Sequence, residues 1–210
     1  MRVAFLLLFI SIGFKDFSQS ITRIDQTNYW FMYESDEERC RNLSTNELIN
    51  GALYLESLNG NPEIEFNFKD GLRHGVQLTW FKNGQLKSEY HYLNGIEHGK
   101  RSGWHANGNP HFVEYFINDL PHGTFKQWHK NGQLILEQFY EDGKQQGVQK
   151  MWYDINGQLS NESHYERGEL DGIIKSWNPK GRLIYESEYK RGVFLRENCW
   201  DDLGEKINCD

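Results

Sequence analysis

Hydrophobic and polar residues alternate along most of this chain in short runs, and glycine-containing turns separate the runs. The segments Val76 to Phe81 and Leu86 to Tyr92 show the pattern, with the turn Lys82-Asn83-Gly84 between them. Alternation with a period of two is typical of a β-strand that has two different faces. Two such runs joined by a short Asn-Gly turn predict a β-hairpin.

The hairpin pattern recurs about every 24 residues. Tryptophans follow one another at intervals of 24, 24, 24, 25 and 23 residues. Self-similarity at a fixed period predicts a repeat architecture. The longer interval falls in the turn Asp154-Ile155-Asn156-Gly157, where an inserted residue costs little. The tryptophans are Trp80, Trp104, Trp128, Trp152, Trp177 and Trp200.

Other residue types recur in the same register. One glycine precedes each first strand, a second glycine lies in each turn, and an aromatic residue ends each second strand. The leading glycines are Gly75, Gly99, Gly123, Gly147 and Gly172; the turn glycines are Gly84, Gly108, Gly132, Gly157 and Gly181; the aromatic residues are Tyr92, Phe116, Tyr140, Tyr165 and Tyr189.

The turn length predicts which residues face each other. A three-residue turn with Gly84 in a left-handed bulge places Trp80 opposite Leu86 and Val76 opposite Tyr90. This register predicts that tryptophan, leucine and the Tyr/Phe column share one face, whereas Glu, Lys and Gln occupy the other. The same turn pairs Trp128 with Leu134, Trp152 with Leu159 and Trp177 with Leu183.

One hairpin buries too few apolar side chains to fold alone, because each large buried side chain contributes about 1.5–3 kcal/mol. Neighbouring hairpins must therefore stack. We expect an all-β fold, an elongated antiparallel meander of about six units of 24 residues. The expected segments are an N-terminal cap at 21–50, repeats at 51–198 and a C-terminal capping hairpin at 199–210.

The first twenty residues predict an export signal. A positive charge at Arg2 precedes an apolar run from Val3 to Phe14, and Ser18-Gln19-Ser20 offers a small-residue cleavage site. The alternative is a buried N-terminal strand or helix. Export predicts a secreted or periplasmic location, where Cys199 and Cys209 could form a disulfide across their turn; free thiols are the other possibility.

Charge and hydropathy narrow the classes of partner. The net charge is −7, which argues against nucleic acid, because binding phosphates requires a basic surface. No apolar stretch reaches the roughly 18 residues needed to span a bilayer. We therefore expect a chain that does not cross a membrane.

Two repeats carry a family resemblance. The segments Gly75 to Leu86 and Gly123 to Leu134 share the pattern G-x-x-x-x-W-x-x-N-G-Q-L when each is read from its leading glycine. They resemble MORN-repeat variants of the type found in bacterial YwqK-family antitoxins, and the resemblance covers about residues 50–205. It implies an all-β scaffold that binds a partner such as a toxin.

Candidate chemistry is sparse. His74, His98 and His122 recur at the repeat period, but equivalent residues of adjacent hairpins lie roughly 10 Å apart, too far for one metal ion. We therefore expect no metal site and no cofactor. Repeated glutamates could suggest acid–base catalysis; cross-strand pairing with Lys or Arg is the preferred interpretation. The glutamates concerned are Glu89, Glu137 and Glu162.

These patterns support a functional expectation. The leading hypothesis is an exported, non-enzymatic β-repeat scaffold that binds another protein, with an antitoxin-like or immunity-like role. The alternative is a cell-envelope module that binds glycan or choline on exposed aromatic rungs. This alternative requires the tryptophan rings to be solvent-exposed in a row.

Overall fold

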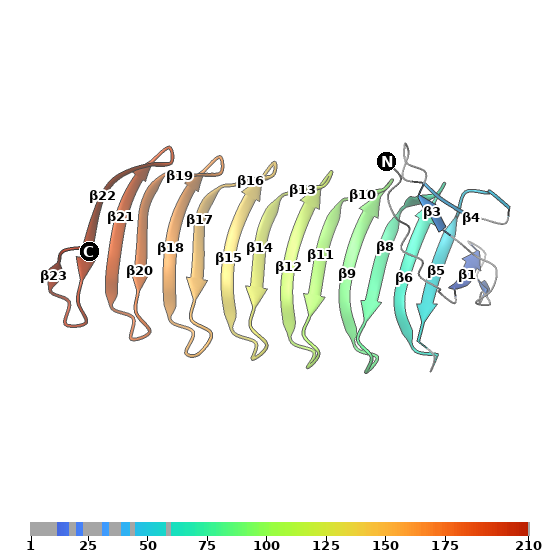
Figure 1. Ribbon diagram of the computed structural model, residues 1–210, viewed down its shortest axis with the longest axis horizontal. Coiled ribbons are helices and arrows are strands. Elements are labelled where there is room, and N and C mark those ends of the chain that lie inside the picture. The colour runs from blue at the N-terminus through green and yellow to red at the C-terminus, as the bar shows by residue number, and fades with distance from the viewer. Residues whose placement is uncertain are drawn as a thin grey trace, which may run out of the picture. The chain divides into compact units, whose positions relative to one another are not determined.

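The computed structural model describes residues 12–16, 20–22, 31–33, 39–42, 45–57 and 60–209. These residues form strands and turns and no helix, which confirms the all-β prediction. None of the described residues belongs to a helix that could cross a membrane. The chain divides into two compact units, unit 1 ending at Glu97 and unit 2 beginning at His98. Within each unit, successive hairpins lie side by side (Figure 1).

Unit 1 contains an antiparallel sheet built from the first hairpins and a separate two-stranded sheet of β3 (Phe31–Tyr33) and β4 (Cys40–Asn42). Strand β1 lies within the segment expected to be an export signal and pairs with β5; residues 1–11 and 17–19 of that segment lie outside the described residues. The strands are β1 (Ile12–Asp16), β2 (Ser20–Thr22), β3 (Phe31–Tyr33), β4 (Cys40–Asn42), β5 (Gly51–Glu56), β6 (Pro62–Lys69), β7 (Leu72–Arg73), β8 (Gly75–Trp80), β9 (Leu86–Leu93) and β10 (Ile96–Glu97).

A small core closes the start of unit 1. The backbone N–H of Cys40 donates to the carbonyl of Gly71 at 2.7 Å, and the N–H of Gly71 donates to the carbonyl of Ile49 at 2.9 Å. Cys40 and Ile49 are buried together with Leu53 and Phe68. The segment before the repeats is therefore bound to the first repeat by backbone hydrogen bonds and apolar contact.

Unit 2 continues the same pattern of hairpins. Each hairpin pairs with the next, as β12 pairs with β14 and β15 with β17. The strands are β11 (Gly99–Trp104), β12 (Pro110–Ile117), β13 (Leu120–Pro121), β14 (Gly123–Trp128), β15 (Leu134–Glu141), β16 (Lys144–Gln145), β17 (Gly147–Trp152), β18 (Leu159–Glu166), β19 (Glu169–Leu170), β20 (Gly172–Trp177), β21 (Leu183–Lys190), β22 (Val193–Trp200) and β23 (Lys206–Ile207).

The hairpin register agrees with the prediction at the turn and differs beyond it. Trp80 faces Leu86, as expected, but the register shifts by one residue directly before Trp80. Val76 consequently pairs with His91, and the predicted pairing with Tyr90 is wrong. A β-bulge has this effect because it adds one unpaired residue to one strand. The other predicted pairs, Trp128–Leu134, Trp152–Leu159 and Trp177–Leu183, are all present.

The bulge also separates two columns that the sequence placed together. Leu78 shares a face with Trp80 and pairs with Glu89, whereas Tyr92 lies three residues beyond Glu89 and pairs with Gly75. Side chains alternate along a strand, so Tyr92 points away from the tryptophan side. The prediction of one shared face is therefore wrong. We call the tryptophan side the front face and the Tyr/Phe side the rear face.

The rear face of unit 2 packs aromatic rings against one another. Phe116 pairs with Gly99, and Tyr140 pairs with Gly123. Phe125 is buried between the two rings, with centroid distances of 5.5 Å to Phe116 and 4.7 Å to Tyr140. The leading glycines are required by their backbone: Gly99 and Gly123 have φ angles of 111° and 86°, in the left-handed region that favours glycine.

The last hairpin of unit 2 is cross-linked. Cys199 and Cys209 form a disulfide, with their Cα atoms 5.4 Å apart. Strand β23 pairs with the end of β22 through Cys199 and Trp200. The disulfide therefore ties this short final strand to the long strand beside it.

Candidate functional site

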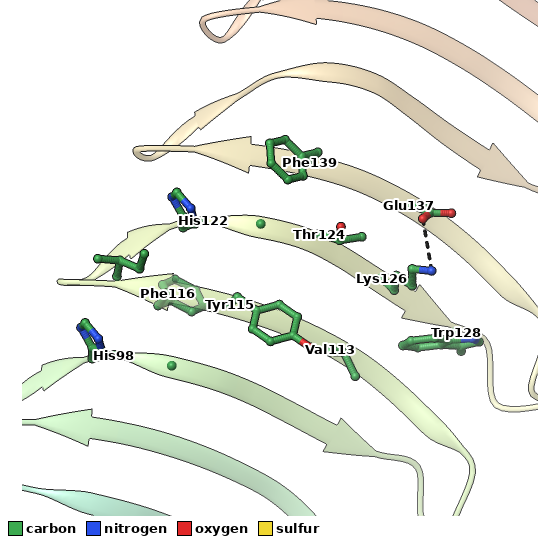
Figure 2. Close-up of a pocket in the computed structure, with 13 residues that line it drawn as sticks. His98, Val113, Tyr115, Phe116, His122, Thr124, Lys126, Trp128, Glu137 and Phe139 are labelled. Atoms are coloured by element: carbon green, nitrogen blue, oxygen red, sulfur yellow. Dashed lines mark ion pairs between the residues drawn. The ribbon is translucent and has the colours of Figure 1, made fainter.

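The front face of unit 2 contains an open hollow of about 670 Å³ between β11 and β15. Figure 2 shows His98 and His122 at one end of the hollow and Trp128 at the other. Pockets of this size are typical of small-molecule and side-chain binding sites. The front-face side chains that line it are Val113, Tyr115, Thr124, Lys126, Trp128, Glu137 and Phe139.

A row of charged residues of alternating sign crosses the floor of this face. Lys126 pairs with Glu137 within one hairpin, and Glu137 pairs in register with Lys150 of the next. The charged row consists of Lys126, Glu137, Lys150, Glu162, Lys175 and Glu186. Within the three hairpins, the Nζ–carboxylate distances are 3.2 Å for Lys126–Glu137, 3.7 Å for Lys150–Glu162 and 4.0 Å for Lys175–Glu186.

These ion pairs explain most of the repeated glutamates. The expected cross-strand pairing with a lysine is confirmed for Glu137 and Glu162. Glu89 differs, because Leu78 lies opposite it and its carboxylate lies 3.5 Å from Nε2 of His91 on the same strand. The pairs are partly exposed, so each contributes little stability and stays available to a further charged group.

An apolar row runs beside the charged row. Three of its members, Phe139, Val148 and Ile173, are each two residues from a charged-row residue on the same strand. Tyr115 is two residues from Val113, which pairs with Lys126, so all four share the front face. Each has a relative exposure between 37% and 41%, so a large part of each side chain is open to solvent. The apolar row consists of Tyr115, Phe139, Val148 and Ile173, and Thr124 and His164 occupy the same level on the strands between them.

The tryptophans form a third row on the other side of the charged row. Trp128 lies two residues beyond Lys126, and Trp152 lies two beyond Lys150. The rings are only partly exposed, in contrast to the rungs that a glycan module requires. The predicted repeat positions Trp80, Trp104, Trp128, Trp152 and Trp177 are all partly buried.

The residue after a tryptophan contacts the following repeat. Nε2 of His105 donates to the carbonyl oxygen of Trp128 at 2.9 Å, and the Tyr153 hydroxyl donates to that of Trp177 at 2.8 Å. The ring of His105 also lies 4.4 Å from that of His111. Burial, and secondarily the charge of His105, lowers the pKa of His111. The hydrogen bonds of His105 and Tyr153 therefore join successive repeats.

The three recurring histidines lie one per turn, as the repeat predicts. Each imidazole contacts the side chain 20 residues further on, in the next turn. Among the described residues, no group of three or more His, Cys, Asp or Glu side chains is placed to hold a metal ion. The contacts are His74 to Asn94 at 3.2 Å, His98 to Asn118 at 3.3 Å and His122 to Asp142 at 3.7 Å.

The turn asparagines have a role that the sequence analysis missed. Asn131 Oδ1 accepts a hydrogen bond from the N–H of Gln133 within its own turn at 2.9 Å, which is an Asx-turn. Its Nδ2 reaches the next repeat. The Asn-Gly pattern was the available signal, but it indicated only the turn. The inter-repeat bonds are Asn107 to the Lys130 carbonyl at 2.7 Å, Asn131 to that of Asp154 at 2.9 Å and Asn156 to that of Pro179 at 2.6 Å.

The comparisons with known proteins agree with this repeat organisation. Three segments match the MORN repeat variant family, residues 73–94, 121–142 and 170–191. Each segment includes one hairpin with its tryptophan, its Gly-containing turn and its closing aromatic residue. No curated protein matches the chain. The matches are consistent with a repeat scaffold.

Proposed function

We propose that this chain is an exported, non-enzymatic β-repeat scaffold that binds another protein through the front face of unit 2. The observation that carries the proposal is the apolar row, which is exposed beside a row of ion pairs. Exposed apolar patches rimmed by polar groups mark interaction sites on soluble proteins, and Tyr115 and Phe139 line such a patch. The matched repeats support a scaffold, since they supply a regular surface.

The composition of this face favours a protein partner. Protein interfaces combine an apolar centre that includes aromatic residues with a polar rim, and here Tyr115 and Phe139 lie next to the Lys126–Glu137 pair. The net charge of −7 opposes binding to nucleic acid. The hollow between the two rings is suited to a large apolar side chain of the partner.

Export and an antitoxin-like or immunity-like role belong to the same proposal. The first twenty residues support export, and the resemblance of the repeats to those of YwqK-family antitoxins supports a partner of the toxin class. Cleavage after Ser20 would remove β1 from its place beside β5. Determining the N-terminal sequence of the chain recovered outside the cytoplasm tests export directly; a chain retained inside the cell with Met1 intact would contradict it.

Affinity capture tests the binding function. The tagged chain is compared with the double variant Tyr115→Ser/Phe139→Ser, which removes both aromatic rings from the hollow. Met151→Ser is the matched control, because Met151 is 41% exposed and lies on the rear face. We expect a protein captured by the parent chain and by the Met151 variant but lost with the double variant. Equal capture by all three would contradict the proposal.

A cell-envelope glycan is the alternative ligand of the front face, and a fluorescence titration tests it. Cell-wall fragments titrated into the parent chain would quench tryptophan fluorescence if they stacked on the front face. We expect no saturable quenching, because the tryptophans are partly buried. Saturable quenching that the double variant abolishes would replace the protein partner by a glycan.

A further inference from the structure

The apolar row has a defined length. Tyr115, Phe139, Val148 and Ile173 lie on β12, β15, β17 and β20, and strands β14 and β18 complete the continuous sheet between them. Neighbouring strands are about 4.8 Å apart, so five spacings give a row about 24 Å long. A ligand that follows the row must therefore cross the strands over this distance.

The row also has a period. Tyr115 and Phe139 are equivalent residues of adjacent hairpins and lie two strands, about 9.6 Å, apart, as do Val148 and Ile173. Phe139 and Val148 lie one strand, about 4.8 Å, apart. Seven residues of an α-helix rise about 10.5 Å. A helix inclined by about 25° to the row therefore advances about 9.5 Å along it for every seven residues, which matches the distance of about 9.6 Å between equivalent residues of adjacent hairpins. An extended strand fits less well, because residues three apart span about 10 Å but point to opposite sides.

The charged row distinguishes a helix from a polyproline segment, whose turn of about 9.3 Å also approaches the repeat. Charges of opposite sign alternate from Lys126 to Glu186 at each strand, about every 4.8 Å. A polyproline segment presents one residue per turn to this row. Because residues of like charge recur about every 9.6 Å, close to the length of that turn, these residues meet charges of only one sign. A helix flank presents two residues per heptad, about 5.3 Å apart on average, and meets both.

We propose that the occupant of the front face is an amphipathic α-helix of the partner protein, lying across the strands with one heptad per hairpin. This inference rests on the proposed function. The helix is about 18 residues long, since at an inclination of about 25° each residue advances about 1.36 Å along the row of about 24 Å. Its apolar stripe contacts the apolar row, one large side chain enters the hollow between Tyr115 and Phe139, and alternating Glu and Lys on one flank contact the charged row.

A synthetic helix tests the inference. The probe is a labelled 21-residue peptide of three heptads, with Leu at the two core positions of each heptad and alternating Glu and Lys on one flank, titrated with the full chain by fluorescence anisotropy. We expect saturable binding. The double variant Tyr115→Ser/Phe139→Ser should weaken it by about tenfold or more, since aromatic anchors dominate such interfaces, while Met151→Ser should leave it unchanged.

Control peptides decide between backbone conformations. One has the same composition with Leu at every second residue, and one is proline-rich with Leu at every third residue. We expect both to bind at least about tenfold more weakly than the helix. Equal or tighter binding of either control, or no binding of the helical probe, overturns the helical occupant. The proposed function then still stands if captured protein is lost with the double variant, so the two failures are distinguishable.

Discussion

The side-chain amide of Asn131 donates a hydrogen bond to the carbonyl oxygen of Asp154 in the next turn, at 2.9 Å. The same side chain accepts from the N–H of Gln133. One asparagine thus fixes its own turn and joins two repeats. This dual contact gives the repeated Asn-Gly turn a function in stacking, beside the bonds that other turn residues such as Asn109 make to the next repeat.

Replacing Asn131 should measure this contact. Asn131→Ala removes both bonds and should lower the free energy of unfolding by about 1–2 kcal/mol, measured by urea denaturation. Asn131→Ser keeps a side-chain acceptor for the N–H of Gln133 and removes the donor without placing a charge against the Asp154 carbonyl, so we expect a smaller loss. Unchanged stability of the alanine variant would show that the inter-repeat bond contributes nothing.

A second prediction concerns Gly103, which pairs with Phe112. A methyl group at Gly103 would overlap the Phe112 ring, so Gly103→Ala should cost about 1–3 kcal/mol of stability. The next repeat has Leu136 facing Gln127 at this position. The double variant Gly103→Ala/Phe112→Leu should therefore recover part of the loss, as judged by its Tm. Additive losses in the double variant would contradict the proposed overlap.

The disulfide gives a third prediction. Cys199 and Cys209 close a loop with a sequence separation of 10, for which cross-linking theory gives about 3 kcal/mol. Cys199→Ser/Cys209→Ser should expose β23 to proteolysis before the rest of unit 2. Limited proteolysis followed by mass spectrometry locates the first cut. First cleavage elsewhere in unit 2 would show that the disulfide does not secure this strand.

Cys40 gives a prediction about pH. Burial raises the pKa of its thiol from 9.0 to about 11, and the nearby charge of Arg73 opposes the shift. The unfolded thiol ionises first as the pH rises, so its contribution to stability is complete below pH 9 and is lost between pH 9 and about 11. Unfolding measured at pH 8 and pH 10.5 should show a larger loss for the parent chain than for Cys40→Ala. Parallel losses in the two chains would contradict this.

Much of the architecture was readable in the sequence. The spacing of Trp80, Trp104 and Trp128 reported the repeat, because each hairpin needs the same residues at the same places to stack on its neighbour. The three-residue turn with Gly84 correctly paired Trp80 with Leu86. Local turn chemistry and periodicity suffice for these features, since both depend on residues close together in the chain.

The candidate site was less predictable. Tyr115 and Phe139 carry no motif, and only the pairing of β12, β14 and β15 places them on one surface beside Lys126 and Glu137. The charges were expected to pair across strands, but their extension into a row depends on the register between hairpins. That register is set by contacts between repeats, which a local pattern does not specify.

The sequence by itself determined the repeat, the hairpin and the residues that meet at its turn. The tertiary structure decided which side of the sheet each column occupies. The physical reason is the β-bulge before Trp80 and its equivalents: one extra residue reverses the alternation of every side chain beyond it. The tryptophans and Tyr92 therefore lie on opposite faces, and the front face is left with the apolar and charged rows.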